Sequence, residues 1–376
     1  MRRTLLGSAG ELAASDWQRL ATGNDPFISR EFLAAAEHCG AAAEALGWRP
    51  MHLVLHDDDS HLAGLLPLYL RQHSFGDFSR DWNWPSAWQQ AGLAYYPKLV
   101  SGVPFTPSPG PRLIAAADAD AGIAAALVDA AIGLVGEVGA SSWQCLFLRE
   151  VERPVLAAAG LALRRGVQFH WMNRGYRDFA DFLCGFTADK RKKLKRERRA
   201  VADAGLRLET LHGDEITPPL WQAIHRHYRD TFRRYGNHPA FTREFFMRVG
   251  RDLGPRMVVF IAFEGDRPVA SSICYRDQEA LYGRHWGTDI SCPGLHFELC
   301  YYRGIEYAIS HGLQRFEPGA QGEHKLARGF EPMPTWSAFW IADPRLREAV
   351  TEFLQREDSA MQDYQAEMIQ HLPYKD

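Results

Sequence analysis

Three stretches of this chain occur twice in the same order, and this internal repeat constrains the fold more than any other feature. PFISREFLAAAEHCG, from Pro26, resembles PAFTREFFMRVGRDLG, from Pro239. HLVLHDDDSHLAGLLPLYLRQH, from His52, resembles VVFIAFEGDRPVASSICYRDQ, from Val258. LAAAGLALRRGVQFHW at 156–171 matches KLARGFEPMPTWSAFW at 325–340 in the positions of Ala, Gly and Trp. Three matches in register order indicate that one α/β unit was duplicated.

The paired stretches also predict local structure. In the first pair, Ser29 and Thr242 stand where a helix N-cap is expected. In the second pair, each copy reads as a strand, a tight turn, a strand, a short turn and a third strand, which predicts a three-stranded antiparallel meander. Helices are expected next at 119–138 and 295–311, and strands after them at 143–148 and 314–318.

This order of elements predicts an α/β protein with mixed sheets and helices on both faces. A chain of 376 residues is too long for one ordinary core and suits two domains. We expect a first domain over 1–175, a basic linking helix over 176–205, and a second domain over 206–376. A helix over 344–370 is expected to close the chain, because Val350, Leu354 and Met361 form one apolar stripe.

Composition excludes several classes of protein. The net charge is only −3, whereas a protein that coats duplex nucleic acid over its whole surface would be far more basic. The six cysteines contain no CxxC pair, which is typical of a reducing compartment. The most apolar run, 121–140, carries Asp129 and Glu137 and therefore predicts a soluble helix. We expect a cytoplasmic protein with no membrane span.

Charged residues are concentrated in one stretch of the second repeat, between 317 and 330. The candidate functional residues there are Glu317, Gln321, Glu323, His324, Lys325 and Arg328. The matching stretch of the first repeat is small and apolar, which favours a single active site in the second repeat and a structural role for the first. The alternative is a solvated loop in which the glycines only make turns.

Two further stretches, YYPKLVSGVPFTPSPGPRL at 95–113 and FEPGAQGEHKLARGFEP at 316–332, carry a family resemblance. They resemble the FemAB-like N-acyltransferase family, which is related to the Fem-type peptidoglycan aminoacyltransferases. The resemblance extends from Pro26 to about Ile341. It implies two tandem GNAT-like acyltransferase domains and transfer of an acyl group to an amine, and it implies no particular substrate.

Acyl transfer requires a base for the attacking amine, stabilisation of the developing oxyanion, and a hold on the donor's anionic tail. We predict that His324 or Glu323 is the base, and that Lys325 and Arg328 hold a phosphate or carboxylate. In the GNAT fold the strand at 279–289 binds the acyl group, so the resemblance assigns substrate contacts to Tyr282, Arg284 and His285. Strand alternation predicts that Tyr282, Arg284 and Trp286 share one face. Glu317 and Gln321 are predicted to bind substrate as well.

The donor stays open between acyl-CoA and aminoacyl-tRNA. GNAT members that use acetyl-CoA hold its pyrophosphate with an R/Q-x-x-G-x-G/A loop, but residues 288–299 here read TDISCPGLHFEL. A helix over Lys190–Arg199, KRKKLKRERR, would place Lys192 and Arg196 on one face as a platform for tRNA. The alternative is a solvated helix face. No metal is expected, because the histidines lack partners at metal-ligand spacing.

The sequence therefore predicts an acyltransferase that moves an acyl or aminoacyl group from an activated carrier to an amine by direct nucleophilic attack. The acceptor would be a small molecule or a peptide. One alternative is an aminoacyl-tRNA-dependent ligase that acts on a peptidoglycan precursor or small peptide. Another alternative is a non-catalytic module that binds a glycan or peptide.

Overall fold

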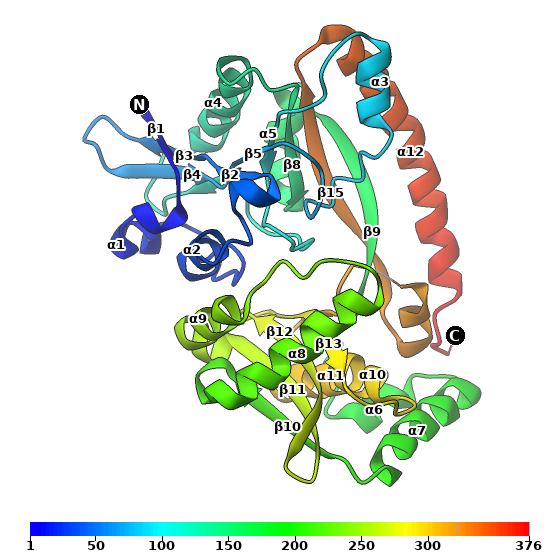
Figure 1. Ribbon diagram of the computed structural model, residues 1–376. Helices are drawn as coiled ribbons and strands as arrows, with labels where there is room; N and C mark the ends of the chain where they lie inside the picture. Colours follow the sequence, from blue (N-terminus) through cyan, green and yellow to red (C-terminus); the bar gives the residue numbers. More distant parts are fainter. Residues whose placement is uncertain (321, 376) are drawn as a thin grey trace. The chain divides into compact units, whose positions relative to one another are not determined.

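The computed structural model describes residues 1–320 and 322–375, and the chain forms two compact units (Figure 1). Unit 1 contains Met1–Gly166 and Pro334–Asp363, and unit 2 contains Val167–Met333 and Tyr364–Asp376. The units are therefore interleaved in sequence and differ from the consecutive segments expected from the repeat. The chain passes from one unit to the other within two long strands and the last helix. The domain boundaries of the repeat itself stay a prediction.

Unit 1 contains two sheets. The first has the order β1 (Arg2–Leu6), β3 (His52–His56), β4 (Leu62–Leu66) and β7 (Ile114–Ala115). The second runs through β15 (Glu331–Ile341), β8 (Ser142–Leu148), β6 (Lys98–Ser101), β5 (Tyr69–Arg71) and β2 (Trp48–Pro50). Strands β6 and β8 are parallel, and the other pairs are antiparallel. This unit therefore has the mixed α/β character that the element order predicted.

The meander expected in the first repeat is wrong in its third strand. Strands β3 and β4 pair as predicted, but β5 pairs with β2 and β6 in the other sheet. Pro67 follows the last residue of β4. A proline has no N–H to donate to a ladder, so the chain leaves the first sheet at this point.

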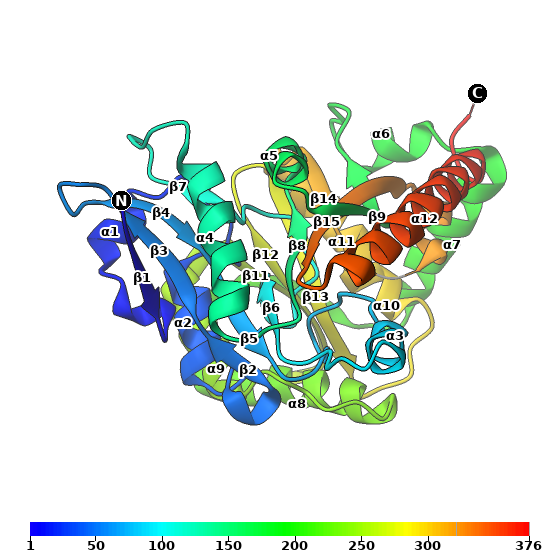
Figure 2. The ribbon, with the colours of Figure 1, turned by 90° about the horizontal axis from the view of Figure 1, so that it is seen from above.

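Helix α4 (Ile123–Glu137) packs against strands of both sheets of unit 1. Figure 2, which views the molecule from above, shows the helix lying along these strands. Its buried side chains, among them Leu127, Ala131 and Leu134, recur at helical spacing and pack in one apolar core with Leu53, Leu66 and Trp143. The remaining helices of the unit are α1 (Ala14–Gln18), α2 (Arg30–His38), α3 (Trp84–Gln90), α5 (Arg153–Ala158) and most of α12 (Pro344–Gln370).

Unit 2 is built on one mixed sheet. Its strands are β10 (Arg207–His212), β11 (Met257–Glu264), β12 (Arg267–Arg276), β13 (Ala280–Thr288), β14 (Arg315–Glu317) and the end of β9 (Ala162–Met172), in that order. Strands β11, β12 and β13 form the antiparallel meander expected in the second repeat. Strand β14 pairs in parallel with β13 and antiparallel with β9. Each unit thus contains one parallel pair, β6–β8 or β13–β14, whose strands are connected through a helix.

The helices of unit 2 begin largely where the sequence indicates. They are α6 (Phe179–Cys184), α7 (Ala188–Asp203), α8 (Pro218–Arg234), α9 (Arg243–Leu253), α10 (Leu295–Phe297) and α11 (Arg303–Ser310), with a π-helical turn at Glu298–Tyr302. The Thr242 hydroxyl accepts the Phe245 N–H at 3.2 Å, and in unit 1 Ser29 accepts the Phe32 N–H at 3.2 Å, so both N-caps are confirmed. The predicted linking helix is two helices, because Gly185 follows α6 and glycine ends helices readily.

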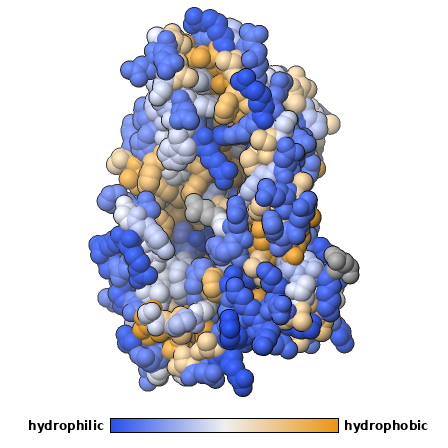
Figure 3. All heavy atoms as spheres, turned by 90° about the vertical axis from the view of Figure 1, so that its right-hand side faces the viewer, coloured by the Kyte–Doolittle hydropathy of each residue, from blue (hydrophilic) through white to orange (hydrophobic). Residues whose placement is uncertain are grey.

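The face of the molecule in Figure 3 is covered mainly by hydrophilic side chains, with smaller hydrophobic patches between them. Within residues 1–320 and 322–375, no helix is long and apolar enough to cross a membrane. The most apolar long helix, α4, buries Val128 and Val135 in the core of unit 1. Its apolar character is thus explained by packing within the protein.

Replacing Gly287 by Ala should destabilise the protein. A Cβ atom there would lie 2.0 Å from the backbone carbonyl oxygen of His227 in α8, so sheet and helix would have to move apart. We expect the free energy of unfolding to fall by about 2–3 kcal/mol, as for other overpacked cores. Chemical denaturation followed by circular dichroism measures this change.

Gly133→Ala is the matched control, because a Cβ at Gly133 meets nothing within 4 Å. Alanine there should stabilise α4 by about 0.5–1 kcal/mol, since glycine is a poor helix former. Equal stability of the two variants would show that the close approach of α8 to β13 is wrong.

Candidate functional site

The candidate site lies where two parallel strands of unit 2 separate. Strand β13 pairs with β14 only from Ala280 to Tyr282, and β14 ends at Glu317. Pro318 follows and cannot donate a ladder hydrogen bond, while β13 continues to Thr288. We call this point the strand fork. It is defined by Tyr282 and Gly283 on β13, by Glu317 at the end of β14, and by Pro318, which follows β14. A fork of this kind exposes strand-end groups to a ligand.

Six polar side chains gather at the strand fork, and we call them the buried polar cluster. They are Gln168, His170, Arg284, Arg315, Glu317 and Lys325. Gln168 and His170 come from β9, where they alternate with Phe169 and Trp171 of the apolar core. Alternation along β9 therefore turns two polar side chains toward the fork and two aromatic ones into the core.

Glu317 is the acidic centre of the cluster. Its carboxylate lies 3.2 Å from Nε of Arg315 and 3.8 Å from a terminal nitrogen of Arg284. Burial alone would raise the pKa of the Glu317 carboxyl, but the neighbouring positive charges hold that pKa below its ordinary value. Burial lowers the pKa of His170 to about 4. At neutral pH the fork therefore holds an ionised carboxylate next to a neutral imidazole.

Lys325 is the most unusual group in the cluster. Its side chain is 2% exposed, and its Nζ donates a hydrogen bond of 2.6 Å to the carbonyl oxygen of Gly319. Burial lowers the pKa of this amine to about 7, with a further contribution from the positive charge of Arg284. About half of the molecules would thus carry a neutral amine at this position at neutral pH. A neutral amine can accept a proton, whereas an ordinary lysine cannot.

Arg328 is fully engaged within the fold. Its guanidinium donates to Glu197 at 3.0 Å, to the Tyr302 hydroxyl at 3.2 Å and to the His324 carbonyl at 2.9 Å. It also lies over the ring of Phe297, with 3.4 Å between the guanidinium carbon and the ring centroid. These contacts tie the short helical segment Glu323–Arg328 to α7 and to the π-helical turn. Arg328 therefore positions the loop that carries Lys325.

The other predicted loop residues lie outside the buried cluster. The His324 imidazole contacts the Tyr301 hydroxyl at 2.8 Å, and burial followed by the charges of Lys325 and Arg328 lowers its pKa. Glu323 is exposed and accepts a hydrogen bond of 2.9 Å from the Tyr364 hydroxyl. Gln321, also predicted to bind substrate, lies outside the described residues.

Strand β13 has a β-bulge at Arg284, although Arg284 still lies beside Tyr282, with 5.7 Å between its guanidinium carbon and the ring centroid. The ladder pairs Ile273 with His285 and Cys274 with Gly283, so β13 carries one extra residue between them. This β-bulge interrupts the period of two, and the sequence contains no signal for it. Beyond the bulge, Trp286 contacts His296, with 5.3 Å between ring centroids.

The three substrate residues predicted on this strand have different surroundings. His285 packs on the opposite face from Trp286, 4.8 Å from the ring of Tyr228, and burial lowers its pKa to about 3. The Tyr282 hydroxyl donates to Asp277 at 2.7 Å and accepts from Arg315 at 3.1 Å. Tyr282 thereby orients Arg315, Arg284 joins the buried polar cluster, and the structure does not bring His285 into it.

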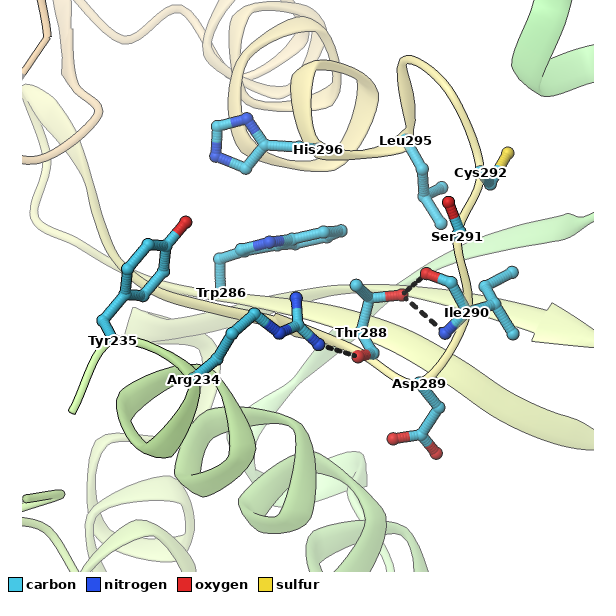
Figure 4. A pocket seen from close by; sticks show the side chains of 10 residues that line it. All are labelled: Arg234, Tyr235, Trp286, Thr288, Asp289, Ile290, Ser291, Cys292, Leu295 and His296. Carbon is cyan, nitrogen blue, oxygen red and sulfur yellow. Dashed lines mark hydrogen bonds between the residues drawn. The ribbon is translucent and has the colours of Figure 1, made fainter. Parts of the chain in front are cut away.

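A pocket of about 560 Å³ opens beside the loop that follows β13 (Figure 4). Its lining residues are Arg234, Tyr235, Trp286, Thr288, Asp289, Ile290, Ser291, Cys292, Leu295 and His296. The indole of Trp286 lies between the His296 ring and the Arg234 side chain. His296 also contacts Tyr301, which bonds to His324, so the wall of the pocket continues into the Glu323–Arg328 segment. The pocket combines flat aromatic surfaces with the guanidinium of Arg234, which donates a hydrogen bond of 3.5 Å to the Thr288 carbonyl.

The basic helix α7 has two different faces. Glu197 and Arg198 turn inward, where Arg198 pairs with Glu298 at 2.8 Å and with Glu306 at 2.6 Å. The exposed basic residues are Lys190, Lys192, Lys193, Lys195, Arg196 and Arg199. The predicted residues Lys192 and Arg196 are thus on the surface, away from the buried polar cluster.

Sequence reasoning missed three members of the site. Gln168, His170 and Arg315 were not singled out, although the polar residues of VQFHW alternate with aromatic ones and thereby give a readable signal. Arg315 gives no such signal, because it is one charged residue in a short strand. Within residues 1–320 and 322–375, no three His, Cys, Asp or Glu residues are grouped closely enough to hold a metal ion.

Comparison with known proteins gives a family match and similar folds. A model of FemAB-like proteins, described as peptidoglycan biosynthesis/recognition, matches residues 8–376. No curated protein sequence matches the chain. The structure of FemX is 10% identical, covers 93% of this chain and 100% of its own, and gives a TM-score of 0.54.

Two more solved structures are similar to this chain. The C-terminal DUF2156 domain of an Agrobacterium fabrum protein is 10% identical, covers 90% of this chain and 95% of its own, and gives a TM-score of 0.53. A tandem GNAT protein from the clavulanic acid biosynthesis pathway is 14% identical, with 91% and 99% coverage and a TM-score of 0.45. At 10% identity, the likeness of FemX and the DUF2156 domain to this chain shows a shared fold and nothing further.

The low pKa of Lys325 predicts a specific pH dependence of stability. The folded-state pKa is about 7 and the ordinary value is 10.5, so between these values the unfolded chain binds a proton that the folded chain does not. The free energy of unfolding should therefore rise with pH in this window, by about 1.4 kcal/mol per pH unit from this group. Below pH 7 both states are protonated and the destabilisation by the buried charge is fully present.

Lys325→Met removes this titration. The difference in unfolding free energy between wild type and Lys325→Met, measured by urea denaturation from pH 6 to pH 10, should increase with pH above 7. The control, Lys375→Met, removes an exposed lysine that bonds to the Cys184 carbonyl and should show a difference that does not vary with pH. A flat profile for Lys325→Met would contradict the low pKa.

Proposed function

The chain belongs to the FemAB-like family, and from this premise we propose that it is an N-acyltransferase whose active site is the buried polar cluster of unit 2. The family match over residues 8–376 confirms the resemblance carried by its sequence motifs. The family and the fold are those of GNAT and Fem acyltransferases. The proposed reaction is attack of an amine on the carbonyl of an activated acyl or aminoacyl donor, without a covalent enzyme intermediate.

The buried amine of Lys325 is the observation that carries this proposal. An amine acceptor arrives largely as an ammonium ion and must lose a proton to become a nucleophile. General bases act best when their pKa lies near the working pH. Lys325, with a pKa lowered to about 7 by burial and by Arg284, meets this requirement. We assign proton acceptance to Lys325 in preference to the exposed His324 and Glu323.

The charges around Lys325 support the other requirements of the reaction. A positive group beside the reacting carbonyl stabilises the oxyanion that forms during attack. Arg284 lies close enough to Lys325 to depress its pKa, and it also lies 3.8 Å from Glu317. Glu317 holds Arg284 and Arg315 in place. We propose that Arg284 provides positive charge to the developing oxyanion.

The first unit contains a buried lysine with the opposite electrostatics. Lys98 lies on β6, in the parallel pair of unit 1, and its amine is 2.9 Å from Asp77 and 2.5 Å from Asp81. Burial raises the pKa of Asp81, but the bonds to Lys98 outweigh it and hold that pKa at about 2. The charge of Lys98 is thus compensated by two buried carboxylates, whereas the amine of Lys325 lies beside a guanidinium. This contrast supports one active site, in unit 2.

The pocket in Figure 4 is the proposed place for part of the acyl donor, because its wall continues into the Lys325 loop. The loop after β13 that lines this pocket differs from the Gly-rich loop that binds the pyrophosphate of acetyl-CoA in GNAT proteins. Its glycine, Gly294, has φ 87° and faces α7, where a Cβ would lie 3.1 Å from the Glu197 carbonyl oxygen. This glycine therefore serves the packing of α7, and the loop does not favour acetyl-CoA as the donor.

An aminoacyl-tRNA donor is the second candidate, and the exposed face of α7 favours it. Within the described part of the chain, none of its six exposed basic residues forms an ion pair with a carboxylate. Basic side chains that the protein leaves uncompensated attract a polyanion. In this version of the function the chain would be an aminoacyl-tRNA-dependent ligase acting on a peptidoglycan precursor or small peptide.

Lys325→Met should abolish most of the transfer activity. Purified protein would be offered isotopically labelled acyl-CoA or aminoacyl-tRNA with a panel of amine acceptors. We expect kcat to fall about 10²–10⁴-fold, as is usual when a general base is lost, with little change in KM for the donor. The wild-type rate should rise with pH through about 7, and this limb should disappear in the variant.

Lys375→Met again serves as the control and should keep the wild-type pH profile. If Lys325→Met kept the wild-type transfer rate and its rise with pH through about 7, the assignment of Lys325 as the base would be refuted. Transfer from neither donor by the wild-type protein would favour the non-catalytic binding module.

The double variant Lys192→Ala/Arg196→Ala tests the tRNA platform. If both side chains contact phosphates, the slope of log affinity against log salt should become shallower by about 1.5. Fluorescence anisotropy with labelled tRNA between 50 and 200 mM KCl measures the slope. Arg2→Ala/Arg49→Ala removes two exposed charges from unit 1 and should leave the slope unchanged. An equal change in both variants would mean that tRNA binds by net charge alone.

A further inference from the structure

A second cavity of unit 2, separate from the proposed active site, has three arginines in its lining. Its volume is about 360 Å³, and it is lined by Gln222, His225, Arg226, Arg229 and Arg243. The first four lie at i, i+3, i+4 and i+7 along α8 and so share one face of that helix. Arg243 is the first residue of α9, which packs against α8 (Figure 1). No carboxylate is among the lining residues.

The arginines of this cavity are only partly neutralised by the protein. Arg226 donates to Asp289 at 2.7 Å, and Arg229 donates to Asp230 at 3.3 Å, in each case through one nitrogen. A guanidinium has five N–H donors, so each keeps most of its donor capacity. Within residues 1–320 and 322–375, Arg243 forms no ion pair. Three guanidiniums thus face two carboxylates, both of which lie outside the cavity lining.

The packing of these like charges is unfavourable in the absence of a ligand. Like charges three residues apart on a helix destabilise it, and Arg229 stands in that relation to Arg226. The fold then adds Arg243 from a second helix. The pKa of His225 is lowered first by burial and then by Arg229 and Arg243, in agreement with an excess of positive potential. A bound anion would relieve this repulsion.

The hollow beside this cavity makes the contrast clear. It measures about 880 Å³ and also contains arginines, but Asp214 and Glu244 are among its lining residues. Arg243 lines both cavities. The lining of the smaller cavity contains no carboxylate, and this cavity is too small for a folded macromolecule but large enough for a small anionic group.

We propose that the cavity between α8 and α9 binds a diphosphate or phosphomonoester group of a small ligand, through Arg226, Arg229 and Arg243. A single carboxylate needs only one guanidinium fork, whereas a diphosphate carries enough charge and acceptor oxygens to engage three. His225 and Gln222 supply further hydrogen-bonding groups at the edge of the cavity. The ion pairs of Arg226 and Arg229 with Asp289 and Asp230 orient two of the three arginines.

Isothermal titration calorimetry with inorganic pyrophosphate tests the proposal. Wild-type protein should bind pyrophosphate saturably at constant ionic strength. Arg243 is exposed at the start of α9, so Arg243→Gln should fold normally, and it should weaken binding about tenfold. Adding Arg229→Gln should remove measurable binding. Sulfate at the same ionic strength should compete only weakly.

Arg251→Gln/Arg267→Gln removes two exposed arginines of the same unit that do not line the cavity, and it should bind pyrophosphate as wild type does. Absence of pyrophosphate binding by the wild type, unchanged binding by the cavity variants, or an equal loss in the control would each overturn the proposal. A nucleoside diphosphate and an alkyl diphosphate, titrated in parallel, distinguish which kind of ligand carries the phosphate. These measurements record binding alone and are independent of transfer activity.

Discussion

The separation of β13 from β14 after Tyr282 and Glu317 is the constraint on which the candidate site depends. Pro318 prevents the ladder from continuing, so the chain turns away and brings Lys325 back against the fork, where its amine bonds to the Gly319 carbonyl. Arg284 stands at the bulge of the longer strand. A buried amine beside a guanidinium loses affinity for its proton, and this effect gives Lys325 the electrostatics of a base.

The two units show how similar elements can carry different electrostatics. Each has a helix-connected parallel pair of strands and a buried lysine near it, Lys98 in unit 1 and Lys325 in unit 2. Two aspartates neutralise Lys98, whereas Lys325 lies beside Arg284, and the carboxylate of the fork, Glu317, is held by arginines. The two lysines differ in the charges that surround the amine. A comparison of residue types alone would treat them as equivalent, because it does not include those charges.

Much of the fold follows from local patterns, and the exceptions have local causes too. The N-caps at Ser29 and Thr242, the meander of β11–β13 and the closing helix α12 all appear where the sequence indicates. The third strand of the first meander fails because Pro67 interrupts the ladder. The β-bulge at Arg284 was not predicted, because bulges have no reliable sequence signal.

The repeat, the α/β class, the family and the loop that carries the charged residues can all be read from the amino-acid sequence, because they depend on order and periodicity along the chain. Which of those charges act together depends on the three-dimensional arrangement of the chain. This arrangement buries Lys325, engages Arg328 with Glu197, leaves Glu323 at the surface, and adds His170 from a strand 155 positions away. The reason is physical: a pKa depends on burial and on charges nearby in space, and neither can be read from spacing along the chain.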